Sequence, residues 1–289
     1  MLVFGGTGML GHELVRTLSE TFDVHFTARD LGLAARANLP GTVHEFEARE
    51  HDPAQLIARL SPAAVVNAVG IVKQLPEASV PTLAIAVNSL FPHRLNEACV
   101  ELGTRLIHIS TDCVFAGALP IGERYLETDL PDAHDLYGRT KLLGEVQDGA
   151  GLTLRTSILG WELERTTGLL EWFAAQDGAT VGGFTHALFS GLTTGELARI
   201  VHRVVDAFPG LRGLFHVASE PITKYELLRL LRDALGQSTE IQPRDTPVVN
   251  RALDGSRFER STGIVVPGWK QMIADYLEPH RSRRDSALA

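Results

Sequence analysis

The chain has 289 residues, of which 44% are hydrophobic and 21% are charged, and its formal net charge is −8. This composition is that of a globular protein with enough length for a large core and for one or two domains. The negative charge argues against nucleic acid or an anionic membrane as a partner, because no surplus of cations is present to neutralise phosphates. A small anionic substrate needs only a few local cations, so it stays compatible with the negative net charge.

The cysteines, Cys99 and Cys113, form no CxxC pair. A disulfide scaffold or a zinc ribbon is therefore not expected, and the cytoplasm is the predicted location. The 11 histidines are scattered and include no HExxH motif, so no metal site is predicted. No apolar run reaches the ~18 residues that span a bilayer. The N-terminus lacks the basic segment and cleavage site of a signal peptide.

Short apolar runs alternate with helical patterns through the first half of the chain. Pro92 should kink or restart the longest helix. Short runs that are buried on both faces are typical of a parallel sheet covered by helices, so we predict an α/β fold with a Rossmann-type doubly wound sheet. The predicted strands are 2–4, 23–28, 42–48, 63–69, 105–110 and 152–157, and the predicted helices are 9–20, 82–103 and 136–147.

The second half has a less regular pattern. Helices are predicted at 170–176, 194–208 and 224–236, a strand at 214–219, and a loop at 242–257. The polar tail from about residue 279 is expected to be disordered.

We predict a Rossmann dinucleotide-binding domain over residues 1–160, to which the chain returns at about 186–219. A smaller, mainly substrate-binding α/β region should occupy 161–289. Because the first strand has only Leu2, Val3 and Phe4, shorter than the usual ~5–6 residues, we expect the natural start to lie a few residues upstream.

A glycine-rich turn separates the first strand from the first helix. It reads Gly5-Gly6-Thr7-Gly8-Met9-Leu10-Gly11 and contains the pattern G-x-G-x-x-G. Such a turn brings the backbone close to a pyrophosphate at the positive end of a helix. The alternative is a turn that only connects two elements. A strand before the motif and a helix after it favour a dinucleotide site.

The end of the second strand bears on the choice of cofactor. Arg29 stands there and could pair with a 2′-phosphate, so NADPH is the predicted cofactor, with NADH as the alternative. Asp30 is the rival residue, because a strand that ended one residue later would favour NADH. Asp52 is expected to reach the adenine, and Val69 and Gly70 are expected to border the cofactor.

Tyr137 and Lys141 lie four residues apart in DLYGRTK, on one face of a predicted helix. By chance, a chain of this composition would contain such a pair only about 0.06 times. An adjacent ammonium should bring the pKa of the phenol closer to working pH, and the lysine can also hold the nicotinamide ribose. Thr111 ends the fifth strand, where its hydroxyl could bond a substrate carbonyl. The alternative is a packed tyrosine beside a solvated lysine.

Several motifs together resemble the extended short-chain dehydrogenases/reductases, and within them the dTDP-4-dehydrorhamnose reductases and their relatives that act on nucleotide-linked 4-keto sugars. They are GGTGMLG, the STD of HISTDCVF, YLETDLPDAHDLYGRTKLLGE and LTLRTS. The resemblance implies that Thr111, Tyr137 and Lys141 form a catalytic triad. It also implies that Tyr137 protonates the C4 oxygen as NADPH delivers hydride, and that the protein is a homodimer.

The sequence departs from this group at Cys113, where relatives often carry a second tyrosine. Sugar 4,6-dehydratases instead tend to read TDE, with a glutamate that assists removal of a proton and water. A thiol, with a pKa near ~8.5, is a poor replacement for that carboxylate. Reduction is therefore favoured over dehydration, with Asp112 and Cys113 as substrate contacts.

Further substrate contacts are expected on the sugar side. Lys73 and Gln74 follow the fourth strand, and Arg251 could neutralise a diphosphate. Phe184 belongs to GGFTHALFSG, which resembles the loop that covers the nucleotide in relatives. For the cations, the alternative is an ordinary surface charge.

Two other functions stay open. A nucleotide-sugar epimerase or dehydratase would recycle tightly held NAD. A non-catalytic regulatory subunit, similar to that of methionine adenosyltransferase, could keep a reductase-like site.

Overall fold

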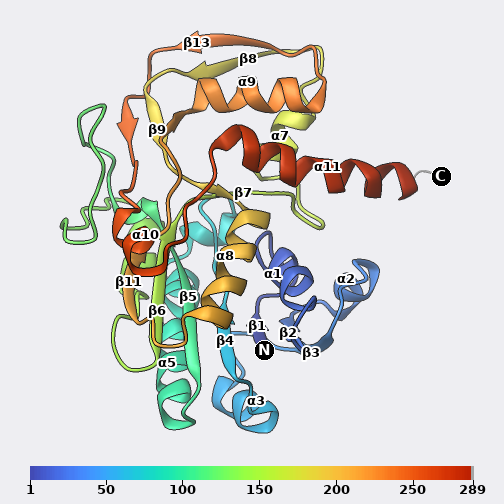
Figure 1. Ribbon diagram of the computed structural model, residues 1–289, viewed down its shortest axis with the longest axis vertical. Helices are drawn as coiled ribbons and strands as arrows, with labels where there is room; N and C mark the ends of the chain where they lie inside the picture. Colours follow the sequence, from blue (N-terminus) through green and yellow to red (C-terminus); the bar gives the residue numbers. More distant parts are fainter. Residues whose placement is uncertain (288–289) are drawn as a thin grey trace.

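The computed structural model describes the backbone of residues 1–287 and the side chains of residues 1–278. Seven parallel strands form the central sheet, in the order β11-β6-β5-β4-β1-β2-β3 (Figure 1). The strand order reverses between β1 and β4, which is the arrangement of a Rossmann-type sheet, so the predicted fold class is confirmed. The strands are β1 (Leu2–Phe4), β2 (His25–Ala28), β3 (Thr42–Glu45), β4 (Ala64–Asn67), β5 (Arg105–Thr111), β6 (Gly151–Thr156) and β11 (Gly213–His216).

Helices cover both faces of this sheet, as Figure 1 shows. One core layer contains Val3 and Ile107 with α1 (Gly11–Leu18) and α8 (Thr194–Ala207). The other contains the alternate side chains, such as Phe4 and Leu106, with α3 (Pro53–Leu60) and α5 (Phe91–Glu101). Successive residues of each strand thus enter opposite cores, which explains why the strands read as continuous apolar runs.

The long predicted helix is interrupted where the sequence suggested. It consists of α4 (Pro81–Ala84), a π-helical turn η2 (Ile85–Leu90) and α5. Pro92 has no amide hydrogen to donate to the carbonyl of Asn88, so the regular ladder cannot continue through it. Gly144 packs against that carbonyl oxygen, and a Cβ at position 144 would collide with it. The break therefore brings this helix close to the segment after α6 (Leu136–Leu143).

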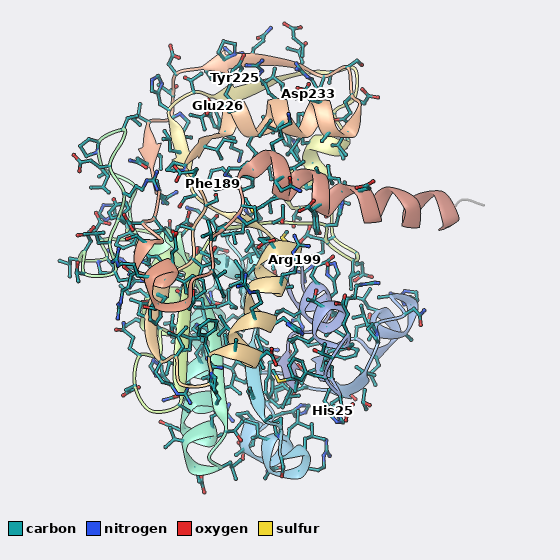
Figure 2. All side chains as sticks on the ribbon, viewed as in Figure 1. His25, Phe189, Arg199, Tyr225, Glu226 and Asp233 are labelled. Carbon is teal, nitrogen blue, oxygen red and sulfur yellow. The ribbon has the colours of Figure 1, made fainter. Side chains whose placement is uncertain are left out.

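Most of the second half of the chain forms a smaller layer beyond the C-terminal ends of the sheet strands (Figure 1). It is built from short strands around α9, which starts with a capping box between Thr223 and Glu226. Figure 2 shows Tyr225 and Glu226 near the start of α9 and Phe189 beside the start of α11, where the Phe189 ring lies 5.3 Å from that of Trp269. Its elements are β7 (Ile158–Leu159), α7 (Leu169–Ala174), β8 (Thr180–Phe184), β9 (Ala187–Phe189), β10 (Leu192–Thr193), β12 (Ile222–Thr223), α9 (Lys224–Leu235), β13 (Glu240–Arg244), β14 (Val249–Asn250) and α11 (Trp269–Ala287). The remaining helix, α10 (Ser256–Thr262), packs against β11 of the main sheet.

The chain returns from this layer to the main sheet, where β11 pairs with β6 and α8 packs on α1. One hydrophobic cluster runs through both halves. The division at residue 160 stays a prediction.

Several short elements were not predicted. Besides β8, β9 and the other short strands, they include α2 (Leu31–Arg36), η1 (Pro76–Ser79) and η3 (Asp112–Val114). Each spans six residues or fewer, too short for a periodic pattern to show.

In the structure α11 runs to Ala287, and the disorder expected from about residue 279 stays a prediction. Buried Trp269, Ile273, Tyr276 and Leu277 anchor the first turns of this helix, and the polar residues beyond them extend it. Residues 288–289 lie outside the described part of the chain. Within that part, no helix combines the length and the apolar character needed to cross a membrane.

Candidate active site

The candidate site lies at the edge of the sheet where the parallel strands end. The glycine turn follows β1, residues 68–70 follow β4, and Thr111 is the last residue of β5. Gly5 packs tightly against the segment after β4, because a Cβ on it would lie 3.1 Å from the Val69 side chain. The turn and the strand ends therefore share one edge, the usual ligand-binding edge of such sheets.

The glycine turn is a cradle that side chains would fill. Gly5 has a positive φ of 84°, and a Cβ on Gly6 would lie 2.5 Å from the Phe26 ring. A Cβ on Gly11 would collide with the carbonyl oxygen of Gly5. The turn is closed by the amide of Gly8, which donates to the Gly5 carbonyl at 3.0 Å. Exposed Gly8 and half-buried Thr7 and Met9 leave an open backbone surface before α1. These residues fit the pyrophosphate of a dinucleotide.

Arg29 follows the last residue of β2, as expected, and its side chain is 69% exposed. Its guanidinium lies 4.0 Å from the Glu47 carboxylate. Asp30, the rival residue, caps α2 and accepts from the Leu33 amide at 3.0 Å. Asp52 caps α3 in the same way through the Ala54 amide, at 3.1 Å. Both carboxylates thus have a local structural role, and contact of Asp52 with adenine stays a prediction.

Thr111 and Tyr137 come together across the site. The Thr111 side chain acts on the Tyr137 phenol and favours its ionisation. The Thr111 hydroxyl also accepts from the Cys113 amide and donates to the Asp112 carboxylate, each at 3.2 Å. Burial is the main cause that raises the pKa of Tyr137, and the nearby Cys113, Asp112 and Asp135 act in the same direction. We expected a neighbouring ammonium to lower this pKa; instead the phenol stays protonated through the neutral range.

Lys141 is buried one helical turn beyond Tyr137, with 5% of its surface exposed. Its ammonium donates to the carbonyl of Ile109 in β5 at 2.8 Å. Burial lowers the pKa of Lys141 to about 8, while the Glu145 carboxylate acts in the opposite direction. The ammonium is therefore poised to change charge slightly above neutral pH.

Asp112, Cys113 and Arg251 lie beside these residues. Asp112 is 4% exposed, and burial raises its pKa to about 6, against the opposing charge of Arg251. Burial likewise raises the pKa of the Cys113 thiol to about 12. Arg251 donates to the carbonyls of Phe115 and Ala116 at 2.9 and 3.1 Å, which ties the second half of the chain to the segment after Thr111.

Lys73 is held at the N-terminus of the Tyr137 helix. Its ammonium lies 2.8 Å from one carboxylate oxygen of Asp135, and the other oxygen caps α6 by accepting from the Gly138 amide at 2.8 Å. Of the other predicted substrate contacts, Gln74 is exposed in the segment after β4. Phe184 is half-buried at the end of β8. Their place in the site stays a prediction, as do the roles of the other site residues.

Sequence reasoning missed several polar residues around this constellation. Asn88 of η2 accepts from the Ile71 amide at 2.8 Å and so fixes the loop after Gly70. Asn67 donates to buried His108 at 3.0 Å, next to Lys141. Glu145 forms an ion pair with Arg155 in β6. The available signal was a polar or charged residue within a run predicted to be buried, such as the arginine of LTLRTS.

Among the residues that the structure describes, no group of three or more His, Cys, Asp or Glu side chains is placed to hold a metal ion.

Known proteins provide a test of these inferences. Residues 1–173 match the family model described as RmlD substrate binding domain. The chain is 26% identical to dTDP-4-dehydrorhamnose reductase of Salmonella typhimurium, over 93% of this chain and 94% of that protein. It is also 26% identical to methionine adenosyltransferase 2 subunit beta of Rattus norvegicus, over 90% of this chain and 81% of that protein.

Among solved structures, the dTDP-4-dehydrorhamnose reductase of Bacillus anthracis in complex with NADP superimposes with a TM-score of 0.74. It is 17% identical, with 96% of this chain and 97% of that chain covered, and this likeness shows the shared fold. The glycine cradle, the three converging side chains and the match over more than half of the sequence lead to one conclusion: the chain belongs to the RmlD substrate binding domain family.

Proposed function

We propose that the protein is an NADPH-dependent reductase of the 4-keto group of a nucleotide-activated 6-deoxy sugar, like the dTDP-4-dehydrorhamnose reductases it resembles. The observation that carries this proposal is the convergence of Thr111, Tyr137 and Lys141 at the sheet edge that also bears the glycine cradle. A dinucleotide in the cradle would extend along this edge towards the three side chains.

The geometry gives each side chain a step in the reduction. Bound NADPH would supply the hydride. Tyr137 is half-buried and protonated, and it can give its proton to the C4 oxygen as negative charge develops there. The Thr111 hydroxyl, which donates to Asp112 in this structure, would turn its proton towards the same oxygen. The Lys141 ammonium, held by the Ile109 carbonyl, would bond the nicotinamide ribose of the cofactor.

Cys113 favours reduction over dehydration. A dehydratase of this fold needs a base to remove a proton from the sugar. The raised pKa of the Cys113 thiol, about 12, leaves it uncharged at neutral pH and unable to act as that base. Asp112 and Cys113 are better placed as polar contacts to the sugar ring.

The cofactor preference rests on Arg29. The rival carboxylate, Asp30, is engaged in capping α2, and the Glu47 carboxylate lies 4.0 Å from the Arg29 guanidinium. A 2′-phosphate would receive two charge-assisted hydrogen bonds from an exposed guanidinium, so NADPH is preferred and NADH is the alternative.

The sugar nucleotide would lie between the triad and the second half of the chain, with Lys73 and Arg251 closest to its diphosphate. Gln74 and Phe184 would complete this side. We place the enzyme in the cytoplasm, where nucleotide sugars are made, as a homodimer. Exposed Ile85 and Leu90 of η2 and Leu143 of α6 offer an apolar surface for that association.

The test is net consumption of NADPH with a dTDP- or UDP-linked 4-keto-6-deoxyhexose. We expect one NADPH to be lost per sugar reduced and no turnover for Tyr137→Phe. An epimerase or dehydratase would instead purify with tightly held NAD and consume no cofactor. Absence of turnover with every such sugar would contradict the proposal.

A second candidate function is suggested by the likeness to methionine adenosyltransferase 2 subunit beta, which covers 90% of the chain. The protein would then bind a synthetase as a regulatory subunit and keep a reductase-like site. Co-purification with a synthetase, together with no reduction of keto sugars, would favour this role.

A further inference from the structure

A buried ion pair lies directly behind the strand that carries Thr111. The guanidinium of Arg155 in β6 donates to both carboxylate oxygens of Glu145, each at 2.7 Å. The two side chains are only 2% and 1% exposed. The attraction within a buried ion pair often fails to repay the loss of hydration, so stability alone does not explain why these charges are here.

On one side, the pair reaches the catalytic strand and helix. The Ser110 hydroxyl, next to Thr111 in β5, donates to Glu145 at 2.6 Å. Glu145 follows Lys141 by four residues, just past the end of α6, and its charge favours the ammonium form of that buried lysine. Glu145 therefore contacts the Thr111 strand and acts electrostatically on Lys141 at the same time.

On the other side, the pair reaches the segment that follows Thr111. The Arg155 guanidinium lies 5.3 Å over the Phe115 ring, which stacks on Tyr125 at 4.0 Å. Arg155 also approaches His216 of β11 at 3.3 Å, and the other ring nitrogen of His216 contacts the Tyr125 carbonyl at 3.1 Å. The segment from Phe115 to Tyr125 is thus packed against the same ion pair that touches β5.

We propose that Glu145 and Arg155 are positioning residues of the reductase site: Glu145 keeps Lys141 charged inside the protein, and Arg155 holds Glu145 and the segment after Thr111 in one arrangement. Neither residue touches the substrate in this scheme. The inference rests on the proposed function for its effect on turnover, but its effect on Lys141 can be measured without a sugar substrate.

The other titratable groups around Lys141 do not replace Glu145. Tyr137 precedes it by one helical turn and is neutral. His108 faces it from β5, but burial and the Lys141 charge hold the pKa of His108 well below its ordinary value, so this ring is also neutral. His93 of α5 acts electrostatically on His108, and a positive charge on His93 would repel the Lys141 ammonium. Within the described part of the chain, Glu145 is the group that opposes the cost of burying Lys141.

The experiment follows the affinity for NADPH against pH, by cofactor fluorescence, in the full-length protein. A charged Lys141 bonds the ribose more strongly than a neutral one. The wild-type affinity should therefore fall as the pH rises through about 8. Glu145→Gln keeps the side-chain shape but removes the charge, so the inflection should move to lower pH by about one unit, a tenfold change in the proton dissociation constant.

A second variant allows for misfolding of the first. Glu145→Gln leaves the Arg155 charge buried and unpaired, whereas Glu145→Gln with Arg155→Met removes both charges and is the milder change. Because the double variant also removes a buried cation that repels Lys141, its downward shift should be smaller than that of Glu145→Gln but larger than that of the control. Ser110→Ala is the matched control, because it removes a hydrogen bond to Glu145 and keeps the charge. Its inflection should stay within a few tenths of a pH unit of the wild type.

A folded double variant that binds NADPH with the wild-type inflection would overturn the inference, and so would a Ser110→Ala inflection that moves as far. Turnover with a 4-keto sugar is measured on the same samples. If the inflection moves as expected but no variant or wild-type sample reduces a sugar, the inference about Lys141 holds and the proposed function fails.

Discussion

Gly138 follows Tyr137 in α6. Replacing Gly138 with alanine should reduce turnover strongly while it lowers the free energy of unfolding only a little. A Cβ at this position would lie 2.6 Å from the Ala133 side chain and closer still to the carbonyl oxygen of Cys113. Carbon atoms normally approach to ~3.5–4.0 Å, so the start of α6 has to move by about 1 Å.

This movement has opposing effects on stability. Overpacking costs about 1–3 kcal/mol, and alanine in place of glycine within a helix returns about 1 kcal/mol. The free energy of unfolding should therefore fall by no more than about 2 kcal/mol. Turnover is more sensitive, because Tyr137 is displaced from Thr111, and a misplacement of about 1 Å can reduce the rate about 100-fold.

The assay compares kcat with the thermal unfolding midpoint of the same preparation. Gly210→Ala is the control, because no atom lies within 4 Å of its added Cβ. If Gly138→Ala turned over sugar at the wild-type rate with an unchanged midpoint, the tight packing of α6 on residues 112–115 would have no role in placing Tyr137.

Three further predictions concern charge. Turnover should fall as the pH rises through about 8, because Lys141 loses its charge there; a kcat profile that stays flat to pH 10 would refute this. Asp112→Asn should raise the melting temperature at pH 8 by a few degrees. Burial holds the pKa of Asp112 at about 6, above its ordinary 3.8, so the carboxylate makes folding less favourable as the pH rises through 6, and a lower melting temperature for the amide would count against this reasoning. Arg29→Ala should raise KM for NADPH about tenfold and leave KM for NADH unchanged, whereas equal changes for both would assign Arg29 no part in cofactor choice.

Much of the fold was predictable because parallel strands buried on both faces have a simple signature. The six predicted strands of the first half all appear in the main sheet, with boundaries shifted by one to three residues at most. Pro92 correctly marked the break in the long helix, since the missing amide hydrogen acts whatever surrounds it. The short strands of the second half were not predictable, because they depend on pairing with distant segments, as β8 does with β13.

The candidate site shows the same division. Local spacing made Tyr137 and Lys141 candidates, and the position at the end of β5 made Thr111 one; their catalytic roles stay predictions. The pKa values of Tyr137 and Lys141 depend mainly on burial, which the fold decides. Burial, which spacing does not reveal, raises the pKa of Tyr137 instead of lowering it. Glu145 and Arg155 are ten residues apart in the chain and meet only because β6 lies beside β5.

The most direct test of the proposed function is the transfer of deuterium. The protein would be incubated with NADPH deuterated at C4 of the nicotinamide, on each face in turn, and with a dTDP-linked 4-keto-6-deoxyhexose. We predict that one of the two cofactors places deuterium on C4 of the sugar, with one NADPH oxidised per product, and that Tyr137→Phe abolishes this transfer. Reduction that leaves no deuterium at C4 with either cofactor, or conversion of the sugar without oxidation of NADPH, would contradict the account.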